Sequence, residues 1–139
     1  MPSAITSTQA ATILVVDDDA NTREYLRSIF ETAGYRALSA GETASALRLL
    51  QTETCDLVLI DLALSEVNGL ALCRLLRAQP ATSKLPVITL ANDDTNSQKQ
   101  EAFAAGADDY IAKSSSAAEI VSRSAAHLRA AQKIGRAHF

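Results

Sequence analysis

The chain has 139 residues, of which 47% are hydrophobic and 21% are charged, and its formal net charge is −3. This length is typical of a single domain, which buries roughly two thirds of the surface that its unfolded chain exposes. The composition excludes a disordered acidic tail and a strongly basic nucleic-acid-binding module. The apolar runs are too short to cross a bilayer, and the first residues lack the features of a signal peptide. We therefore expect a cytoplasmic protein that contacts neither a membrane nor nucleic acid.

Three continuous apolar runs predict the central strands of a sheet. They are ILVV at Ile13–Val16, LVLI at Leu57–Ile60 and VITL at Val87–Leu90. Continuous apolar runs are typical of parallel strands that helices cover on both faces. Two shorter and more mixed segments, Tyr35–Ser39 and Ala107–Ile111, are candidates for outer strands.

Amphipathic segments separate these strands and predict helices. Asp19 is suited to cap the N-terminus of the first helix, and Gly34 is suited to end it. Tyr25 and Phe103 are assigned to the apolar faces of their helices. The predicted helices cover Ala20–Ala33, Ala44–Thr52, Asn68–Ala78, Asp94–Ala105 and Ala117–Gln132.

The alternation of strand and helix, repeated five times, predicts a doubly wound α/β domain with a five-stranded parallel sheet. The pattern occupies residues 11–132, so residues 1–10 and 133–139 are expected to be short tails. Cys55 and Cys73 lie in apolar segments without metal-binding spacing, and we expect both to be reduced thiols.

Charged residues gather where the predicted strands end. Asp17, Asp18 and Asp19 follow the first strand, Asp61 follows the third, and Lys113 follows the fifth. In open α/β sheets, ligands bind beyond the carboxyl ends of the strands. Crowded carboxylates repel one another, and a hard cation such as Mg²⁺ (or Mn²⁺) relieves that repulsion. Together with a lysine, this arrangement is suited to transferring a phosphoryl group onto an aspartate.

Four sequence segments carry a family resemblance. They are ILVVDDD (Ile13–Asp19), DLVLIDLALSEVNG (Asp56–Gly69), LPVITLAN (Leu85–Asn92) and GADDYIAK (Gly106–Lys113). Through them the chain resembles the receiver domain of bacterial two-component response regulators, the CheY-like family, over nearly its whole length. The resemblance implies a flavodoxin-like strand order of 2-1-3-4-5. It also implies that the protein takes a phosphoryl group from a sensor histidine kinase or a phosphotransfer protein, and slowly hydrolyses it.

The resemblance assigns a role to each residue of the site. Asp61 matches the phosphoacceptor, and Lys113 matches the lysine that pairs first with the acceptor and then with the phosphoryl group. Asp18 matches the direct Mg²⁺ ligand, and Asp17 matches the carboxylate that holds the metal through water. Ala63 would offer its backbone to the metal and to the phosphoryl group.

The chain departs from the family at the switch. The family usually has Thr or Ser at the end of the fourth strand, where its hydroxyl follows the phosphoryl group, but the family's spacing from Lys113 leads to Ala91. Thr89 is the alternative, in a register that needs two extra residues before Lys113. Tyr110 matches the aromatic switch residue, and the backbone N–H of Asn92 remains able to bind a phosphoryl oxygen.

A face of mixed charge suggests a homodimer. Its residues resemble the surface through which receivers of DNA-binding regulators pair, formed by the fourth and fifth helices and the fifth strand. The residues of the expected dimer face are Lys99, Asp108, Asp109, Glu119 and Arg123.

His127 and His138 are interpreted as surface residues rather than phosphate carriers.

Two other functions compete with the phosphorylated receiver. The first is a degenerate receiver that binds proteins without a phosphorylation switch. It is favoured by Ala91 and by Ser65 and Ser114, which replace prolines common after the acceptor and after the lysine.

The second is a phosphohydrolase of the haloacid dehalogenase type. Its Asp-x-Asp signature fits Asp17 and Asp19, but Asn21 occupies the last signature position, and the chain is short for that fold.

Overall fold

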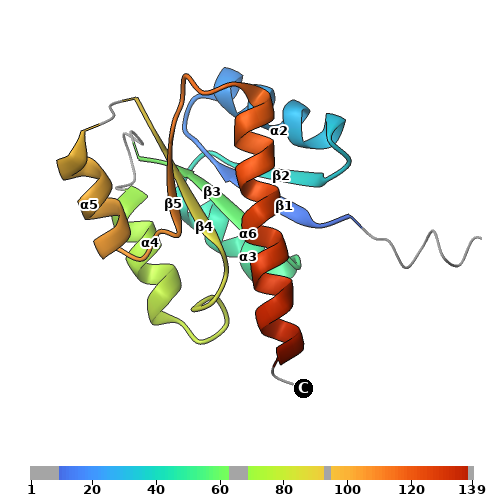
Figure 1. Ribbon diagram of the computed structural model, residues 1–139, viewed down its shortest axis with the longest axis vertical. Coiled ribbons are helices and arrows are strands. Elements are labelled where there is room, and N and C mark those ends of the chain that lie inside the picture. Colours follow the sequence, from blue (N-terminus) through green and yellow to red (C-terminus); the bar gives the residue numbers. More distant parts are fainter. Residues whose placement is uncertain (1–9, 63–68, 93–94, 138–139) are drawn as a thin grey trace, which may run out of the picture.

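Strands and helices alternate along the chain in the computed structural model, which describes residues 10–62, 69–92 and 95–137 (Figure 1). The strands are β1 (Thr12–Val16), β2 (Arg36–Ala40), β3 (Leu57–Asp61), β4 (Val87–Ala91) and β5 (Asp109–Ala112). The helices are α2 (Ala20–Thr32), α3 (Thr43–Thr52), α4 (Gly69–Ala78), α5 (Asn96–Ala104) and α6 (Ala117–Ala137). The strands pair in parallel in the order β2-β1-β3-β4-β5, which confirms the predicted fold class and strand order.

Both faces of the sheet are covered, as the continuous apolar runs predict. In β1, Ile13 and Val15 pack in one core with residues of α2 and α6. Leu14 and Val16 point to the other face and pack in a second core with residues of α3 and α4. The two layers of helices are visible on either side of the sheet (Figure 1). This double burial follows from the side-chain alternation of a strand.

Glycines end two of the helices at the predicted places. Gly34 follows α2 with a φ of +97°, and Gly106 follows α5 with a φ of +111°. Only glycine adopts this left-handed region without strain, so both residues stop their helices and turn the chain toward the next strand. Ala33 and Ala105, predicted as the last helical residues, are the C-caps.

Several other boundaries differ from the prediction. The outer strand β2 lies one residue later than expected, and α3 begins one residue earlier, at Thr43. The expected starts of two helices, Asn68 and Asp94, lie outside the described residues. The largest difference is at the C-terminus, where α6 runs to Ala137 and takes in five residues of the expected tail. The segment after Gln132 contains no proline, so the helix continues.

The last strand, β5, starts two residues later than the expected Ala107. The backbone N–H of Asp108 donates to the carbonyl of Val87, and the Asp108 carboxylate accepts the N–H of the same residue. One of these two bonds uses the Asp108 side chain in place of its backbone carbonyl, so regular pairing of β5 with β4 begins only at Asp109.

Two aromatic residues that we expected in the core are exposed. Tyr25 and Phe103 each keep 49% of their surface in contact with solvent. Each is adjacent to the residue that takes the inward position, Leu26 in α2 and Ala102 in α5. A step of one residue turns a helix by about 100°, so the neighbour of an inward residue points away from the sheet.

The two cysteines are free, as predicted. Burial raises the pKa of both Cys55 and Cys73 to about 11, so the thiols are protonated near neutral pH. No helix among the described residues is long and apolar enough to cross a membrane.

Candidate functional site

The carboxyl ends of β1, β3 and β5 bring four of the predicted site residues to one edge of the sheet. Val16 and Ile60 are register partners in the neighbouring strands β1 and β3. Asp17 follows Val16 and Asp61 follows Ile60, so the two carboxylates emerge side by side. Asp18 continues the same loop, and Lys113 follows the end of β5.

Three carboxylates and one ammonium group meet at this edge. Asp17, Asp18 and Asp61 each offer an oxygen, and these oxygens lie within 4.8 Å of one another. The Nζ atom of Lys113 lies 2.7 Å from Oδ2 of Asp61 and 3.6 Å from Oδ2 of Asp17. The two partners of Lys113 are buried, with exposed fractions of 0% for Asp17 and 2% for Asp61.

Burial of Asp17 opposes the charged form of its carboxyl group. Burial raises its pKa from 3.8 to about 6; a hydrogen bond from the Asp19 N–H opposes this shift, and the nearby charge of Asp61 adds to it. Lys113 partly compensates through its positive charge. Burial also opposes the charged form of Lys113, but Asp61 and Asp17 together raise the pKa of the ammonium group, which stays protonated.

One oxygen of Asp17 makes the cluster fit for a metal ion. Its Oδ1 accepts the N–H of Asp19 at 2.9 Å, whereas its Oδ2 is buried without a hydrogen-bond partner among the described residues. Buried polar atoms without partners are rare and costly. A carboxylate oxygen of this kind, next to two further carboxylates, matches the oxygen ligands of a hard divalent cation.

Asp19 has a different task from its two neighbours. Its Oδ2 atom accepts hydrogen bonds from the N–H and the hydroxyl of Thr22, at 3.1 and 2.5 Å, and it caps α2 as predicted. These bonds lower its pKa. Because Asp19 caps the helix, the structure gives no support to the paired Asp17 and Asp19 of the phosphohydrolase alternative.

Of the expected switch residues, Ala91 lies next to Lys113, and Tyr110 packs in one buried cluster with Ala91. Ala91 ends β4, and its carbonyl accepts the N–H of Lys113 at 2.8 Å, which favours the register that places Ala91 rather than Thr89 next to the site. Thr89 lies deeper, and its hydroxyl donates to the carbonyl of Asp109 at 3.0 Å. Tyr110 is 4% exposed, and its hydroxyl donates to Oε1 of Gln98 at 2.6 Å.

Backbone groups of Asn92 and Ala63 were predicted to bind the phosphoryl group. Asn92 follows β4 at the same edge of the sheet and is exposed. Ala63 lies outside the described residues, as does Ser65.

On the expected dimer face, Asp109 is engaged within the chain. Its two oxygens accept hydrogen bonds from Arg123 at 2.6 and 3.2 Å, and Nε2 of His127 lies 3.0 Å from one of them. Burial acts to raise the pKa of Asp109, but the hydrogen bonds with His127 and Arg123 outweigh it and lower the pKa. Arg123 also contacts Glu119 at 3.2 Å. His127, expected only as a surface residue, is therefore part of a hydrogen-bond network that joins α6 to β5.

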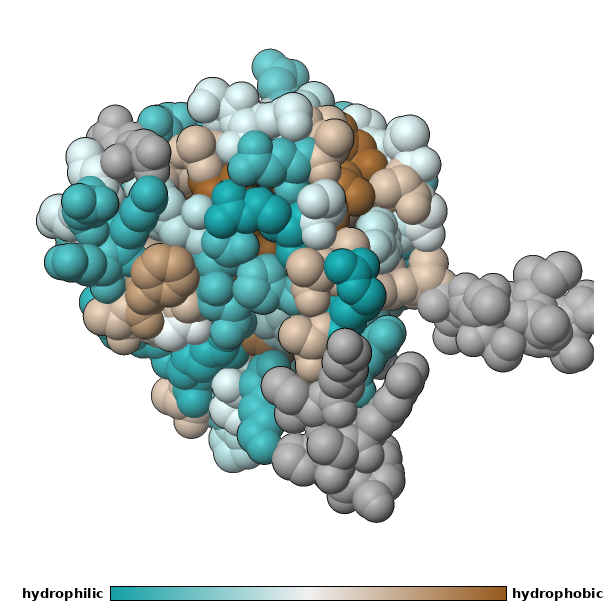
Figure 2. Space-filling view, in the orientation of Figure 1, coloured by the Kyte–Doolittle hydropathy of each residue, from teal (hydrophilic) through white to brown (hydrophobic). Residues whose placement is uncertain are grey.

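The other two residues of that face also have partners in the chain. Asp108 binds Arg77 at 2.8 Å, and the Nζ atom of Lys99 lies 5.9 Å from the centre of the Tyr110 ring. Figure 2 shows that the face carrying β5, α5 and α6 is largely hydrophilic, with hydrophobic residues scattered across it.

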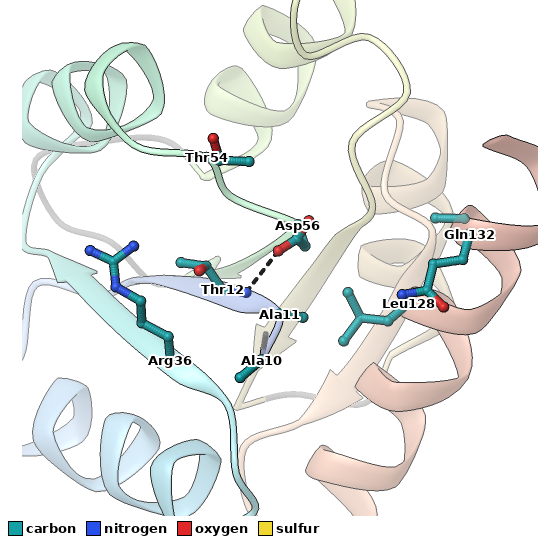
Figure 3. A pocket seen from close by; sticks show the side chains of 9 residues that line it. Ala10, Ala11, Thr12, Arg36, Thr54, Asp56, Leu128 and Gln132 are labelled. Carbon is teal, nitrogen blue, oxygen red and sulfur yellow. Dashed lines mark hydrogen bonds between the residues drawn. The ribbon is translucent and has the colours of Figure 1, made fainter. Parts of the chain in front are cut away.

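A cavity of about 700 Å³ opens at the opposite, amino end of the strands (Figure 3). Its labelled side chains come from β1 and the two residues before it, from β2, from the segment before β3, and from α6. The carboxylate of Asp56, the acidic group in this cavity, accepts a hydrogen bond from the backbone N–H of Thr12 at 2.8 Å. The cavity therefore lies far from the charged cluster and shows no comparable chemistry.

A family model described as the response regulator receiver domain matches residues 13–125. The chain belongs to this family. It is 38% identical over 118 residues to the phosphate regulon transcriptional regulatory protein PhoB of Pseudomonas aeruginosa, covering 85% of this chain and 52% of that protein. It is 36% identical over 132 residues to the alkaline phosphatase synthesis transcriptional regulatory protein SphR of Synechococcus elongatus, covering 88% of this chain and 51% of that protein. The receiver domain thus spans about half the length of the curated relatives it matches.

Solved structures agree with this assignment. The receiver domain of the Francisella response regulator 1452 has a TM-score of 0.79 and 30% identity, covering 86% of this chain and 97% of that one. The signal receiver domain of a signal transduction histidine kinase from Syntrophus aciditrophicus has a TM-score of 0.80 and 31% identity, covering 87% of this chain and 92% of that one. The chain is a receiver domain of the two-component type, and phosphorylation and Mg²⁺ binding at an acidic pocket are general in its family.

Proposed function

We propose that this receiver domain accepts a phosphoryl group on Asp61, with Mg²⁺ (or Mn²⁺) at the acidic cluster. The donor is the phosphohistidine of a sensor histidine kinase or a phosphotransfer protein, and the exchange takes place in the cytoplasm. The observation that carries the proposal is the contact of Lys113 with Asp61 at 2.7 Å, beside the Oδ2 atom of Asp17, which accepts no hydrogen bond among the described residues. A buried nucleophile, a cation and an open metal ligand are thereby assembled at one edge.

The chain's own residues divide the work of the transfer. An oxygen of Asp61 forms the new bond to phosphorus while the bond from phosphorus to the histidine nitrogen breaks, and the imidazole leaves with the bonding electrons. Lys113 and the backbone N–H groups of Asn92 and Ala63 bind the phosphoryl oxygens, and the buried position of Asp61 limits access of water. Slow hydrolysis of the product resets the site.

Metal binding falls to the side chains of Asp17, Asp18 and Asp61 and to the backbone carbonyl of Ala63. When bound, Mg²⁺ supplies positive charge that offsets the negative charge of the phosphoryl oxygens. Asp17 contributes its Oδ2 atom, which is buried without a hydrogen-bond partner among the described residues.

The proposed switch is atypical because residue 91 has no hydroxyl. Ala91 and Tyr110 belong to the same small buried cluster, and Gln98 holds the Tyr110 hydroxyl. We infer that Tyr110 keeps this inward position whether or not Asp61 is phosphorylated. Replacing Gln98 with Ala would then alter the environment of Tyr110 in the unphosphorylated protein, measured by NMR of the ring, whereas phosphorylation of the wild type would leave it unchanged.

The absence of a hydroxyl at residue 91 also favours a second candidate, a degenerate receiver that binds its partner without phosphorylation. This candidate predicts a partner complex of equal affinity in the wild type and in Asp61→Asn, whereas the leading proposal predicts that the affinity changes on phosphorylation.

The homodimer through α5, β5 and α6 is also a proposal. Lys99, Asp108, Asp109, Glu119 and Arg123 already have contacts within the chain, so two copies would have to share or exchange them. Sedimentation of the wild type and of Arg123→Glu, with and without phosphorylation, tests it.

The main experiment measures intact mass after incubation with acetyl phosphate and Mg²⁺. We expect one added phosphoryl group in the wild type, and none in Asp61→Asn or after removal of the metal. A folded wild-type protein that gains no phosphoryl group from acetyl phosphate or from a phosphorylated partner would overturn the proposal.

A further inference from the structure

Arg23 connects the helix α2 to the backbone of the metal site. It lies in the first turns of α2 and is half-buried. Its Nη1 atom donates a hydrogen bond to the backbone carbonyl of Asp17 at 2.8 Å. The guanidinium therefore reaches the main chain of a candidate metal ligand, while the carboxylate of that ligand is bound by Asp19 and Lys113.

The contact completes a set of bonds that fix Asp17. Its N–H donates to the carbonyl of Ala40 at 3.1 Å, and its Oδ1 accepts the N–H of Asp19 at 2.9 Å. The carbonyl held by Arg23 belongs to the peptide group between Asp17 and Asp18. Because a peptide group is planar, fixing this carbonyl also fixes the plane from which the Asp18 backbone continues.

Gly41 leaves the space in which the guanidinium lies. A Cβ atom at this position would lie 2.9 Å from Nη1 and 3.4 Å from Cζ of Arg23. The three atoms nearest to such a Cβ all belong to Arg23. Since Gly41 is not one of the glycines with positive φ, it matters here for its small size rather than for its backbone conformation.

We propose that Arg23 is a positioning residue of the metal site, and that Gly41 is the residue that admits it. Arg23 holds the peptide between Asp17 and Asp18 so that the two carboxylates and Asp61 present their oxygens together. It acts through the backbone, and it does not take part in the chemical step. This inference rests on the proposed function, because it concerns the same metal-dependent phosphorylation.

Two substitutions remove the contact by different routes. Arg23→Met keeps the aliphatic part of the side chain and removes the donor, whereas Gly41→Ala displaces the guanidinium and leaves the arginine in place. Arg23→Lys keeps a cationic donor that can reach the same carbonyl. Arg27→Ala is the matched control, because Arg27 lies one turn further along α2 and pairs with exposed glutamates.

The measurements are the dissociation constant for Mg²⁺, by calorimetry, and the rate of labelling by acetyl phosphate as a function of Mg²⁺ concentration. Loss of a group that orients metal ligands lowers metal affinity by roughly tenfold or more. We expect Arg23→Met to raise the dissociation constant and the half-saturating Mg²⁺ concentration by about tenfold, with the labelling rate at saturating Mg²⁺ unchanged. Gly41→Ala should shift both values in the same direction, and Arg23→Lys should restore part of the affinity.

The combination of the two changes gives the sharpest outcome. In the Arg23→Met background, Gly41→Ala should have no further effect, because the atoms that its Cβ would contact are gone. Mg²⁺ affinity in folded Arg23→Met and Gly41→Ala indistinguishable from that of Arg27→Ala would overturn the positioning role, and labelling of the wild type would still support the proposed function. A wild type that binds no Mg²⁺ and gains no phosphoryl group would overturn both.

Discussion

Replacement of Asp17 by Asn should stabilise the metal-free protein at alkaline pH. Asp17 is fully buried, and the pKa of its carboxyl rises from 3.8 to about 6, mainly because of burial. Each tenfold change in a proton equilibrium corresponds to about 1.4 kcal/mol, so the ionised carboxylate lowers the free energy of unfolding by about 3 kcal/mol. An asparagine carries no charge and avoids this cost.

The sign of the pH dependence follows from the direction of the shift. Between the two pKa values, 3.8 and about 6, the folded metal-free protein binds more protons than the unfolded chain. Its stability therefore falls as the pH rises through this window, and the full cost is present above it. The advantage of Asp17→Asn should be absent at the acid end of the window and should reach its maximum of about 3 kcal/mol at the alkaline end.

Urea denaturation followed by circular dichroism, in a chelating buffer, measures this difference. Added Mg²⁺ should then narrow or reverse it, because a ligand at a hundred times its dissociation constant stabilises the protein that binds it by about 2.7 kcal/mol. The wild type should gain more than Asp17→Asn. A metal-free Asp17→Asn protein that is less stable than the wild type at about pH 8 would refute the argument that burial penalises this carboxylate.

Three further predictions concern residues that support the site. Gly69→Ala places a Cβ 2.9 Å from the carbonyl oxygen of Asp61, and the forced shift should cost about 1–3 kcal/mol in urea denaturation. Arg77→Ala removes donors to several backbone carbonyls and should lower the free energy of unfolding by about 3 kcal/mol, measured in the same way. Thr89→Val leaves the carbonyl of Asp109 without this donor and should cost about 1 kcal/mol, seen as a lower melting temperature. An unchanged stability would contradict the structural role assigned to the residue concerned.

Most of the fold is predictable because its signals are local. Strands such as β3 contain continuous apolar runs, here Leu57–Ile60, and Gly34 and Gly106 mark the helix ends through their backbone freedom. The inward and outward sides of a helix are less local. Tyr25 and Phe103 are apolar and close to the correct spacing, but the sheet decides which neighbour faces inward.

The candidate site was predictable to the extent that its residues stand at strand ends. Asp17, Asp61 and Lys113 could be brought together because parallel strands place their carboxyl ends at one edge. The contacts of Arg23 and His127 could not be predicted in this way. Both side chains lie on helices, and their partners lie on other segments whose distance depends on the packing of the helix against the sheet.

Locating the phosphoryl group within the chain tests directly whether Asp61 is the acceptor. After labelling with acetyl phosphate and Mg²⁺, borohydride reduces an aspartyl phosphate to an alcohol, and mass spectrometry of the peptides identifies the modified residue. We expect Asp61 to carry the alcohol, and we expect Arg23→Met to reach the same product only at a higher Mg²⁺ concentration. Modification at Asp17 instead of Asp61, or labelling that persists in Asp61→Asn, would contradict the assignment of the acceptor.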